Sequence, residues 1–317
     1  MTTPVTPPVT SPPTLVPHLW YDKEAVEAAR FYVSVFPESA VDFVGQIRNT
    51  PSGDCDLVRF TLWGQPFMAI SAGPMFRFNP SISFFVLFDP GRDPQARERL
   101  DAMWDKLVDG GQALMPLDAY PFSARFGWIQ DRYGLSWQLM LTDTSSESRP
   151  PIVPALMFTG DACGKAEAAG EFWREIFPDS QAGQLVRYGP GMEPNPAGSV
   201  MFSDFRLGNT WMAAMDSGYP HGFAFNEAIS FVVPCEGQAS IDHYWSKLSA
   251  VPEAEVCGWC KDPFGISWRI VPAEMDTLMR SGDQAGIDRL VQALLQMKKL
   301  DAAALRSAFE GTGSSRP

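Results

Sequence analysis

The stretch GWIQDRYGLSW (residues 127–137) decides the fold, because it recurs as GWCKDPFGISW at residues 258–268. In each copy two short apolar segments flank the pattern Asp-x-aromatic-Gly, and Asp and Gly favour tight turns. Each stretch therefore predicts a β-hairpin. A motif of this length that occurs twice indicates an internal duplication.

Four more blocks repeat in the same order, which extends the duplication over most of the chain. The paired blocks are FYVSVFPES (31–39) and FWREIFPDS (172–180), GQPFMA (64–69) and GNTWMA (208–213), FNPSISF (78–84) and FNEAISF (225–231), and WDKL (104–107) and WSKL (245–248). The chain is thus expected to be a tandem repeat of one domain of about 125 residues, a common domain size.

The spacing of apolar residues predicts the order of elements in each copy. Alternation typical of strands and 3–4 spacing typical of helices give βαβββ twice per copy, hence four βαβββ units. The expected fold is α+β: two tandem domains, each of paired βαβββ modules forming a curled mixed sheet, plus a C-terminal helical tail. The expected segments are a disordered Pro/Thr-rich tail (1–16), a first domain (17–141), a linker (142–151), a second domain (152–272), C-terminal helices (273–310) and a disordered end (311–317).

Composition excludes several classes of partner. Lys and Arg number 25 against 37 Asp and Glu, a net charge of −12, so nothing offsets the phosphate charge of a nucleic acid or an anionic membrane. No apolar run approaches the ~20 residues that span a bilayer, and the N-terminus lacks the basic and apolar regions of a signal peptide. With 5 cysteines and no export signal, the protein is expected in the reducing cytoplasm.

The motifs resemble the PhnB-like branch of the vicinal oxygen chelate (VOC) superfamily, the glyoxalase/bleomycin-resistance/dioxygenase fold. The resemblance covers about residues 17–310, and its strings are GQPFMA (64–69), FNEAISF (225–231), CGWCKDPFGISW (257–268) and LQMKKL (295–300). It implies that two modules curl into a cup whose concave face holds the ligand. Many relatives work as dimers, so the tandem chain resembles a fused pseudo-dimer, and a further homodimer stays open.

Members of this branch often carry a demethylubiquinone methyltransferase label, which the residues do not support. An adenosyl cofactor needs a glycine-rich turn between a strand and a helix. The nearest string, YGPG at 188–191, lies in a proline-rich loop.

Metal ligands are scarce. The resemblance implies a divalent ion held through His and Glu, and a catalytic site needs about three protein ligands. The chain has only His18, His221 and His243. His243 is expected on a helix surface, and His18 has Ala155 as its counterpart in the second copy. Neither copy shows a His/His/Glu set, so we expect no cofactor and disfavour a divalent metal.

Candidate ligand-binding residues are polar and aromatic. They are His221, Asn226, Glu227, Trp259 and Trp268 in the second copy, and Asn79, Trp128 and Trp137 in the first. The alternatives are loop residues that satisfy local backbone groups and strand tryptophans that pack in the core. Asp131 and Asp262 are expected to cap the hairpin turns. The lone CxxC at 257–260 lacks the second pair that zinc needs and the helix N-terminus that redox chemistry needs.

Three functional hypotheses follow. In the first, each half binds a small organic molecule in an aromatic-lined cup, with the second half favoured because it keeps more of the family strings. In the second, the protein is a metal-dependent lyase, isomerase or dioxygenase-type enzyme. In the third, it is a non-catalytic interaction or regulatory module that docks through the helices after residue 272.

Overall fold

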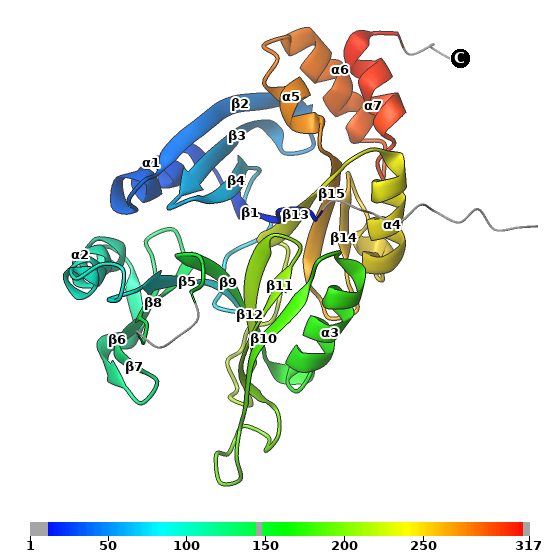
Figure 1. Ribbon diagram of the computed structural model, residues 1–317. Helices are drawn as coiled ribbons and strands as arrows, with labels where there is room; N and C mark the ends of the chain where they lie inside the picture. Colours follow the sequence, from blue (N-terminus) through cyan, green and yellow to red (C-terminus); the bar gives the residue numbers. More distant parts are fainter. Residues whose placement is uncertain (1–11, 144–147, 313–317) are drawn as a thin grey trace, which may run out of the picture.

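The computed structural model describes residues 12–143 and 148–312, and its elements fall into four modules and a tail (Figure 1). The first module holds β1 (Val16–Tyr21), α1 (Ala25–Val35), β2 (Ala40–Thr50), β3 (Gly53–Leu62) and β4 (Gln65–Ser71). The second holds β5 (Ile82–Phe88), α2 (Ala96–Val108), β6 (Gln112–Tyr120), β7 (Ser123–Gln130) and β8 (Ser136–Leu141). The third holds β9 (Ile152–Phe158), η1 (Gly160–Ala162), α3 (Ala166–Ile176), β10 (Gln181–Arg187), β11 (Val200–Leu207) and β12 (Thr210–Asp216).

The fourth module is shorter than the other three. It holds β13 (Ile229–Cys235), α4 (Gln238–Leu248), η2 (Pro252–Ala254), β14 (Trp259–Lys261) and β15 (Ser267–Pro272). Three strands were expected after its helix, and the described residues contain two. The backbone N–H groups of Cys257 and Gly258 donate to the carbonyls of Met297 and Lys298, at 2.8 Å each. The C-terminal tail thus takes the backbone bonds that a further strand would make.

The strands form two mixed sheets, as the α+β prediction requires. Sheet A has the order β14-β15-β13-β1-β4-β3-β2, and sheet B has the order β10-β11-β12-β9-β5-β8-β7-β6. The pairing of modules differs from the expected one, because each sheet takes one module from each copy. The antiparallel pairs β1–β13 and β5–β9 form the two seams. Among the described residues, no sheet, and therefore no cup, belongs to the second half alone.

The modules of one copy pack face to face instead of edge to edge. The main hydrophobic core joins residues of α1–α4 with one face of both sheets. Phe67 of β4 and Phe84 of β5, for example, lie in different sheets with ring centroids 5.2 Å apart. Packing the apolar faces of two modules of one copy against each other buries more surface than pairing their edge strands would. The edge strands are thus free to pair with strands of the other copy.

Two buried aspartates fasten the sheets to each other at equivalent places. Asp131, in the β7–β8 turn of sheet B, accepts hydrogen bonds from the Tyr32 hydroxyl of α1 and from Trp137 Nε1, both at 2.8 Å. Asp262, in the β14–β15 turn of sheet A, accepts from Trp173 Nε1 of α3 at 2.7 Å and from Trp268 Nε1 at 2.9 Å. Their other carboxylate oxygens accept backbone N–H groups of the turns, so the predicted turn capping is confirmed.

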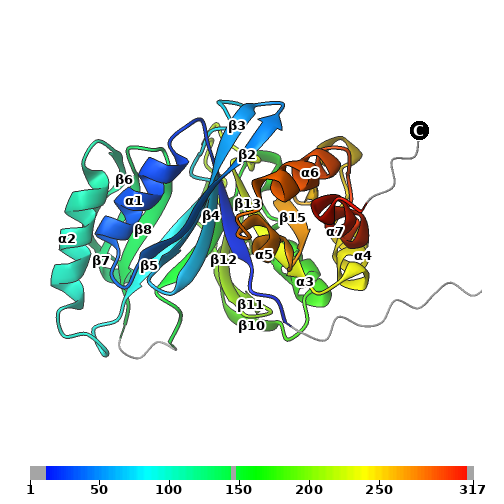
Figure 2. The ribbon, with the colours of Figure 1, turned by 90° about the horizontal axis from the view of Figure 1, so that it is seen from above.

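The tail forms α5 (Met275–Met279), α6 (Gln284–Leu294) and α7 (Ala302–Glu310). The three helices lie against sheet A, between the β2–β3 hairpin and β13–β15 (Figures 1 and 2). The apolar side of α6 packs there on Val16, Val232 and Val271. One of the two sheets is therefore covered on both faces.

The two ends of the chain and the linker lie only partly within the described residues. Residues 12–16, which the sequence places in the N-terminal tail, lie against the β11–β12 turn, where Asn209 donates to Pro12 and Pro13 and the Leu15 N–H donates to Thr210. Residues 144–147 of the predicted linker fall outside the described residues. Within the described chain, no helix has the length and apolar character needed to cross a membrane.

Candidate functional site

The inner face of sheet B, on the side away from α2 and α3, carries a cluster of buried and half-buried aromatic and methionine side chains. Alternation along each strand sends one set of residues to the helices and the other to this face. The inner set is made up of Phe85, Leu87, Met115, Tyr120, Phe126, Trp128, Met140, Val153, Ala155, Phe202, Trp211, Ala213 and Met215. Unlike the inner face of sheet A, it has none of the described helices packed on it (Figures 1 and 2).

The polar groups of this face are paired with one another. Arg149 forms an ion pair with Asp204 at 2.7 Å, and its guanidinium lies 3.8 Å from the centroid of the Trp211 ring. The two charged side chains are only 10% and 9% exposed. Gln138 donates to the Ser83 hydroxyl and Trp128 Nε1 to the Ser136 hydroxyl, at 2.8 Å each. The inner face of sheet B is therefore apolar, aromatic and close to neutral.

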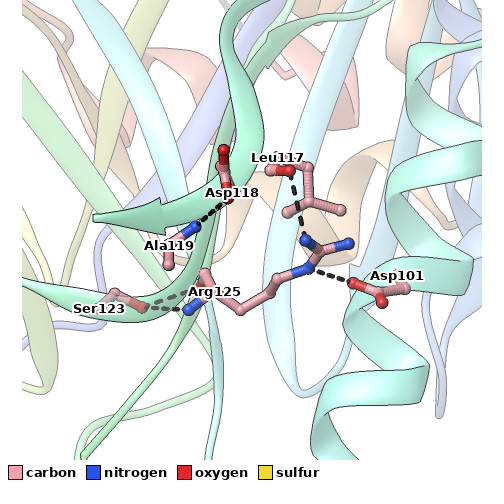
Figure 3. A network of polar contacts seen from close by, with 6 residues as sticks. All are labelled: Asp101, Leu117, Asp118, Ala119, Ser123 and Arg125. Atoms are coloured by element: carbon pink, nitrogen blue, oxygen red, sulfur yellow. Dashed lines mark hydrogen bonds and ion pairs between the residues drawn. The ribbon is translucent and has the colours of Figure 1, made fainter.

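The outer edge of sheet B is held by Arg125 of β7 (Figure 3). Its Nε donates to Asp101 of α2 at 2.7 Å, and another guanidinium nitrogen donates to the Leu117 carbonyl of β6 at 3.3 Å. The Ser123 hydroxyl, in turn, donates to the Arg125 carbonyl at 2.9 Å. These bonds fix β6, which carries Met115, relative to the rest of the inner face.

The inner face of sheet A has a different character. Trp259 lies there with its Nε1 3.3 Å from the Ser230 hydroxyl. The Arg269 guanidinium lies 4.3 Å from the Trp259 ring centroid, and the His18 ring meets the same indole edge-on at 5.6 Å. Burial, and then the charge of Arg269, hold the pKa of His18 well below its usual range. Burial likewise lowers the pKa of Arg269 to about 10.

The four candidate tryptophans separate into two pairs. Trp137 and Trp268 are fully buried on the helix-covered faces and donate to Asp131 and Asp262, so their surroundings are those of core residues. Trp128 and Trp259 lie on the inner faces and are partly exposed. The second pair therefore keeps its place as ligand-binding candidates.

The candidate asparagines connect the two copies. Asn79 Nδ2 donates to the Ala224 carbonyl at 3.0 Å, and Asn226 Nδ2 donates to the Arg77 carbonyl at 2.8 Å. Each Oδ1 accepts the backbone N–H two residues further along. This arrangement matches the alternative in which the side chains satisfy loop backbone groups.

The remaining candidates lie apart from each other. Glu227 pairs with Lys261 at 2.5 Å beside sheet A. His221, in the loop after β12, is bonded through Nε2 to the Ser217 hydroxyl at 2.6 Å and stacks on Phe223. Burial lowers the pKa of His221.

The residues across the centre of both sheets do not suit a divalent metal. Strand register places His18 beside Met68 and Ser230, and Ser230 beside Ser267, in sheet A. The equivalent residues in sheet B are Ala155, Ala213, Ser83 and Ser136. Sheet A supplies a single imidazole and sheet B none, and neither set holds a carboxylate, so the donors that such an ion needs are not assembled. No group of three His, Cys, Asp or Glu suited to a metal occurs among the described residues.

Sequence reasoning did not single out Arg149 or Trp211. Arg149 lies in a polar segment whose composition predicts an exposed linker. Its partner Asp204 is 55 positions away in the sequence, so no local pattern indicates the pair. Trp211 could not be found from the repeat, because the repeat aligns it with Phe67, which packs in the main core, whereas Trp211 lies on the inner face of sheet B.

The neutral state of His18 predicts how stability depends on pH. An unfolded histidine gains its proton near pH 6.5, whereas buried His18 stays neutral to a lower pH. Below pH 6.5 the unfolded state therefore binds more protons, and His18 contributes a loss of up to about 1.4 kcal/mol per pH unit as the pH falls. Urea unfolding at pH 7.5 and 5.5 should show a smaller loss for His18→Ala than for the wild type. Equal losses in the two proteins would refute this prediction.

The fold and the paired modules define a tandem protein of the glyoxalase/VOC class. A family model described as 3-demethylubiquinone-9 3-methyltransferase matches residues 13–140 and again 150–271. The chain belongs to this family, the PhnB-like branch of the VOC superfamily, and the double match agrees with the duplication.

Solved structures are similar over one copy or over both. A PhnB protein from Bacillus cereus is 36% identical and covers 40% of this chain and 98% of its own, with a TM-score of 0.36. A protein from Staphylococcus aureus is 30% identical over 42% of this chain and 100% of its own, with a TM-score of 0.17. Glyoxalase I from Zea mays is 10% identical and covers 85% of this chain and 97% of its own, with a TM-score of 0.50. None of the curated proteins searched matches the chain.

The methyltransferase name of the family model finds no matching site here. The YGPG string lies in the loop between β10 and β11, not between a strand and a helix. The strand-to-helix turn that cradles an adenosyl cofactor is therefore not formed by these glycines.

Proposed function

We propose that the protein binds a small, planar, neutral organic molecule on the inner face of sheet B. The supporting observation is the set of half-buried aromatic and methionine side chains on this face, with none of the described helices packed on them. Aromatic rings offer stacking surface to a planar ligand, and methionine adapts to irregular shapes. Ligand sites are commonly lined in this way.

The charge of the face supports a neutral ligand. Arg149 and Asp204 compensate each other at 2.7 Å, so a charged ligand would have to break that pair or enter an apolar surface without a counterion. The Ser83 and Ser136 hydroxyls are bonded to Gln138 and Trp128 rather than to an imidazole or a carboxylate. Their surroundings favour binding over turnover, because a nucleophilic hydroxyl needs an adjacent base.

A neutral fluorescent probe, N-phenyl-1-naphthylamine, tests the proposal on the full-length protein. We expect saturable binding, and we expect Trp128→Ala to weaken it about tenfold or more, since a central aromatic anchor contributes over about 1.4 kcal/mol. Trp259→Ala is the matched control, because it removes the equivalent indole from sheet A. Equal affinity of Trp128→Ala and the wild type, or a loss confined to Trp259→Ala, would disprove the assignment to sheet B.

We also infer a reducing compartment, such as the cytoplasm, and a chain that acts as its own dimer. All five cysteines are free, which suits a compartment that keeps thiols reduced. Each copy completes the other's sheets, which is the role a second subunit would have in a dimer of single-copy chains.

A further inference from the structure

Three neighbouring side chains on the inner face of sheet A bury polar atoms without a hydrogen-bond partner in the described structure. These atoms are His18 Nε2, Ser267 Oγ and Arg269 Nε. Strand register brings them together, since His18 pairs with Ser230 across the seam and Ser230 pairs with Ser267. His18 and Ser267 are each only 2% exposed. Buried groups of this kind are costly unless something satisfies them, so a missing partner is expected.

Arg269 adds a positive charge that nothing described compensates. Its guanidinium stacks on Trp259, and no carboxylate forms an ion pair with it in the described structure. The neighbouring cations of the sheet are already paired, Lys261 with Glu227 and Arg59 with Asp276. An arginine stays protonated at neutral pH even with its pKa lowered to about 10. An anion would supply the counter-charge that Arg269 lacks among the described residues.

The equivalent place in sheet B shows what the same scaffold does without this charge. The repeat aligns Arg269 with Gln138 and His18 with Ala155. Gln138 donates to the Ser83 hydroxyl at 2.8 Å, so its amide nitrogen has a partner within the chain. The two sheets thus share the surrounding serines and tryptophans, and they differ in an arginine and a histidine that lack partners.

The covering helices leave one side of this place accessible. Helix α6 packs on Val16, Val232 and Val271, whereas Trp20, Trp259 and Arg269 remain partly exposed. Trp20 and Trp259 stand at 65° to one another with ring centroids 6.5 Å apart. Aromatic surface therefore lies next to the unpaired guanidinium.

We propose that His18, Ser267, Arg269 and Trp259 form a second ligand site, the Arg269 site, which binds a small aromatic carboxylate. The guanidinium fork matches the two oxygens of a carboxylate, while the Ser267 hydroxyl and the His18 ring offer further donors. The indoles of Trp20 and Trp259 contact the planar body of the ligand. The Arg269 site lies on sheet A, whereas the face proposed above lies on sheet B. The Arg269 site takes anionic ligands, and the face of sheet B takes neutral ones.

Titration calorimetry of the full-length protein with benzoate and benzamide tests the proposal. We expect benzoate to bind at least tenfold more tightly than the neutral benzamide. Arg269→Gln should weaken benzoate at least tenfold, and His18→Ala should weaken it severalfold. Both substitutions install the residue that the other copy carries at the same place, so the variants are expected to fold, as circular dichroism would verify.

Trp128→Ala serves as the control on sheet B and should bind benzoate as the wild type does. The proposal is overturned if the wild type binds no benzoate, if benzamide binds equally well, or if folded Arg269→Gln keeps the wild-type affinity. Those outcomes leave the neutral-probe experiment untouched, because that experiment depends on Trp128 and sheet B. The two proposals can therefore fail separately.

Discussion

Replacing Asp262 by alanine should lower the free energy of unfolding by about 3–5 kcal/mol, because two buried indole N–H groups lose their acceptor and each buried donor left unsatisfied costs about 1–3 kcal/mol. The carboxylate is 1% exposed and accepts four hydrogen bonds. The substitution would leave the indole N–H groups of Trp173 and Trp268 buried in the core without a hydrogen-bond acceptor. Because Trp173 belongs to α3 on sheet B and Asp262 to sheet A, the contact between the sheets should loosen as well.

Urea unfolding, followed by tryptophan fluorescence and circular dichroism, measures this effect. Asp262→Asn should cost less, about 1–3 kcal/mol, because the amide keeps one acceptor oxygen but sets its NH₂ group against N–H donors. Asp105→Ala, on the exposed side of α2, is the control and should change stability by no more than about 0.5 kcal/mol. A cost for Asp262→Ala as small as that of Asp105→Ala would show that the network does not hold the sheets together.

The repeat made the elements predictable, because hairpin turns and amphipathic helices are local properties. The sequence correctly predicts Asp131 and Asp262 as turn residues, because Asp and Gly at this fixed spacing favour one backbone geometry. Their bonds to Tyr32 and Trp173 depend on how the modules pack, and no local pattern encodes that. The same holds for the sheets: β1 is equally apolar whether its neighbour is a strand of its own copy or β13 of the other.

The candidate tryptophans show the limit of alternation as a guide to the site. Trp128 and Trp137 belong to adjacent strands of one hairpin, and only the register across the turn decides which of them faces the helices. In the structure Trp137 does, paired with Ile129, and Trp128 faces inward, paired with Gln138. The scarcity of histidine was informative in a different way, since His18 lies at the centre of sheet A without a second imidazole beside it.

Removing residues 275–317 should unfold sheet A or render the chain insoluble, which bears on the hypothesis that the C-terminal helices are a docking surface. Ile287, Leu290 and Val291 of α6 are at most 5% exposed and pack on Val16, Val232 and Val271. Truncation would open that apolar surface to water. The helical face that could have received a partner is already occupied by the protein's own sheet, so any docking would have to use the polar side of the helices.

Leu290→Ala gives a graded form of the same experiment. Leu290 is 1% exposed, and truncating a core leucine costs about 2–5 kcal/mol, depending on how far the cavity collapses. Leu185→Ala is the matched control, since Leu185 on the edge strand β10 is 46% exposed and should contribute less than about 0.5 kcal/mol. A soluble, fully folded truncated chain, together with a Leu290→Ala variant as stable as Leu185→Ala, would contradict this account. That result would instead support the hypothesis that the C-terminal helices dock a partner, because their apolar side could then detach from sheet A at little cost in stability.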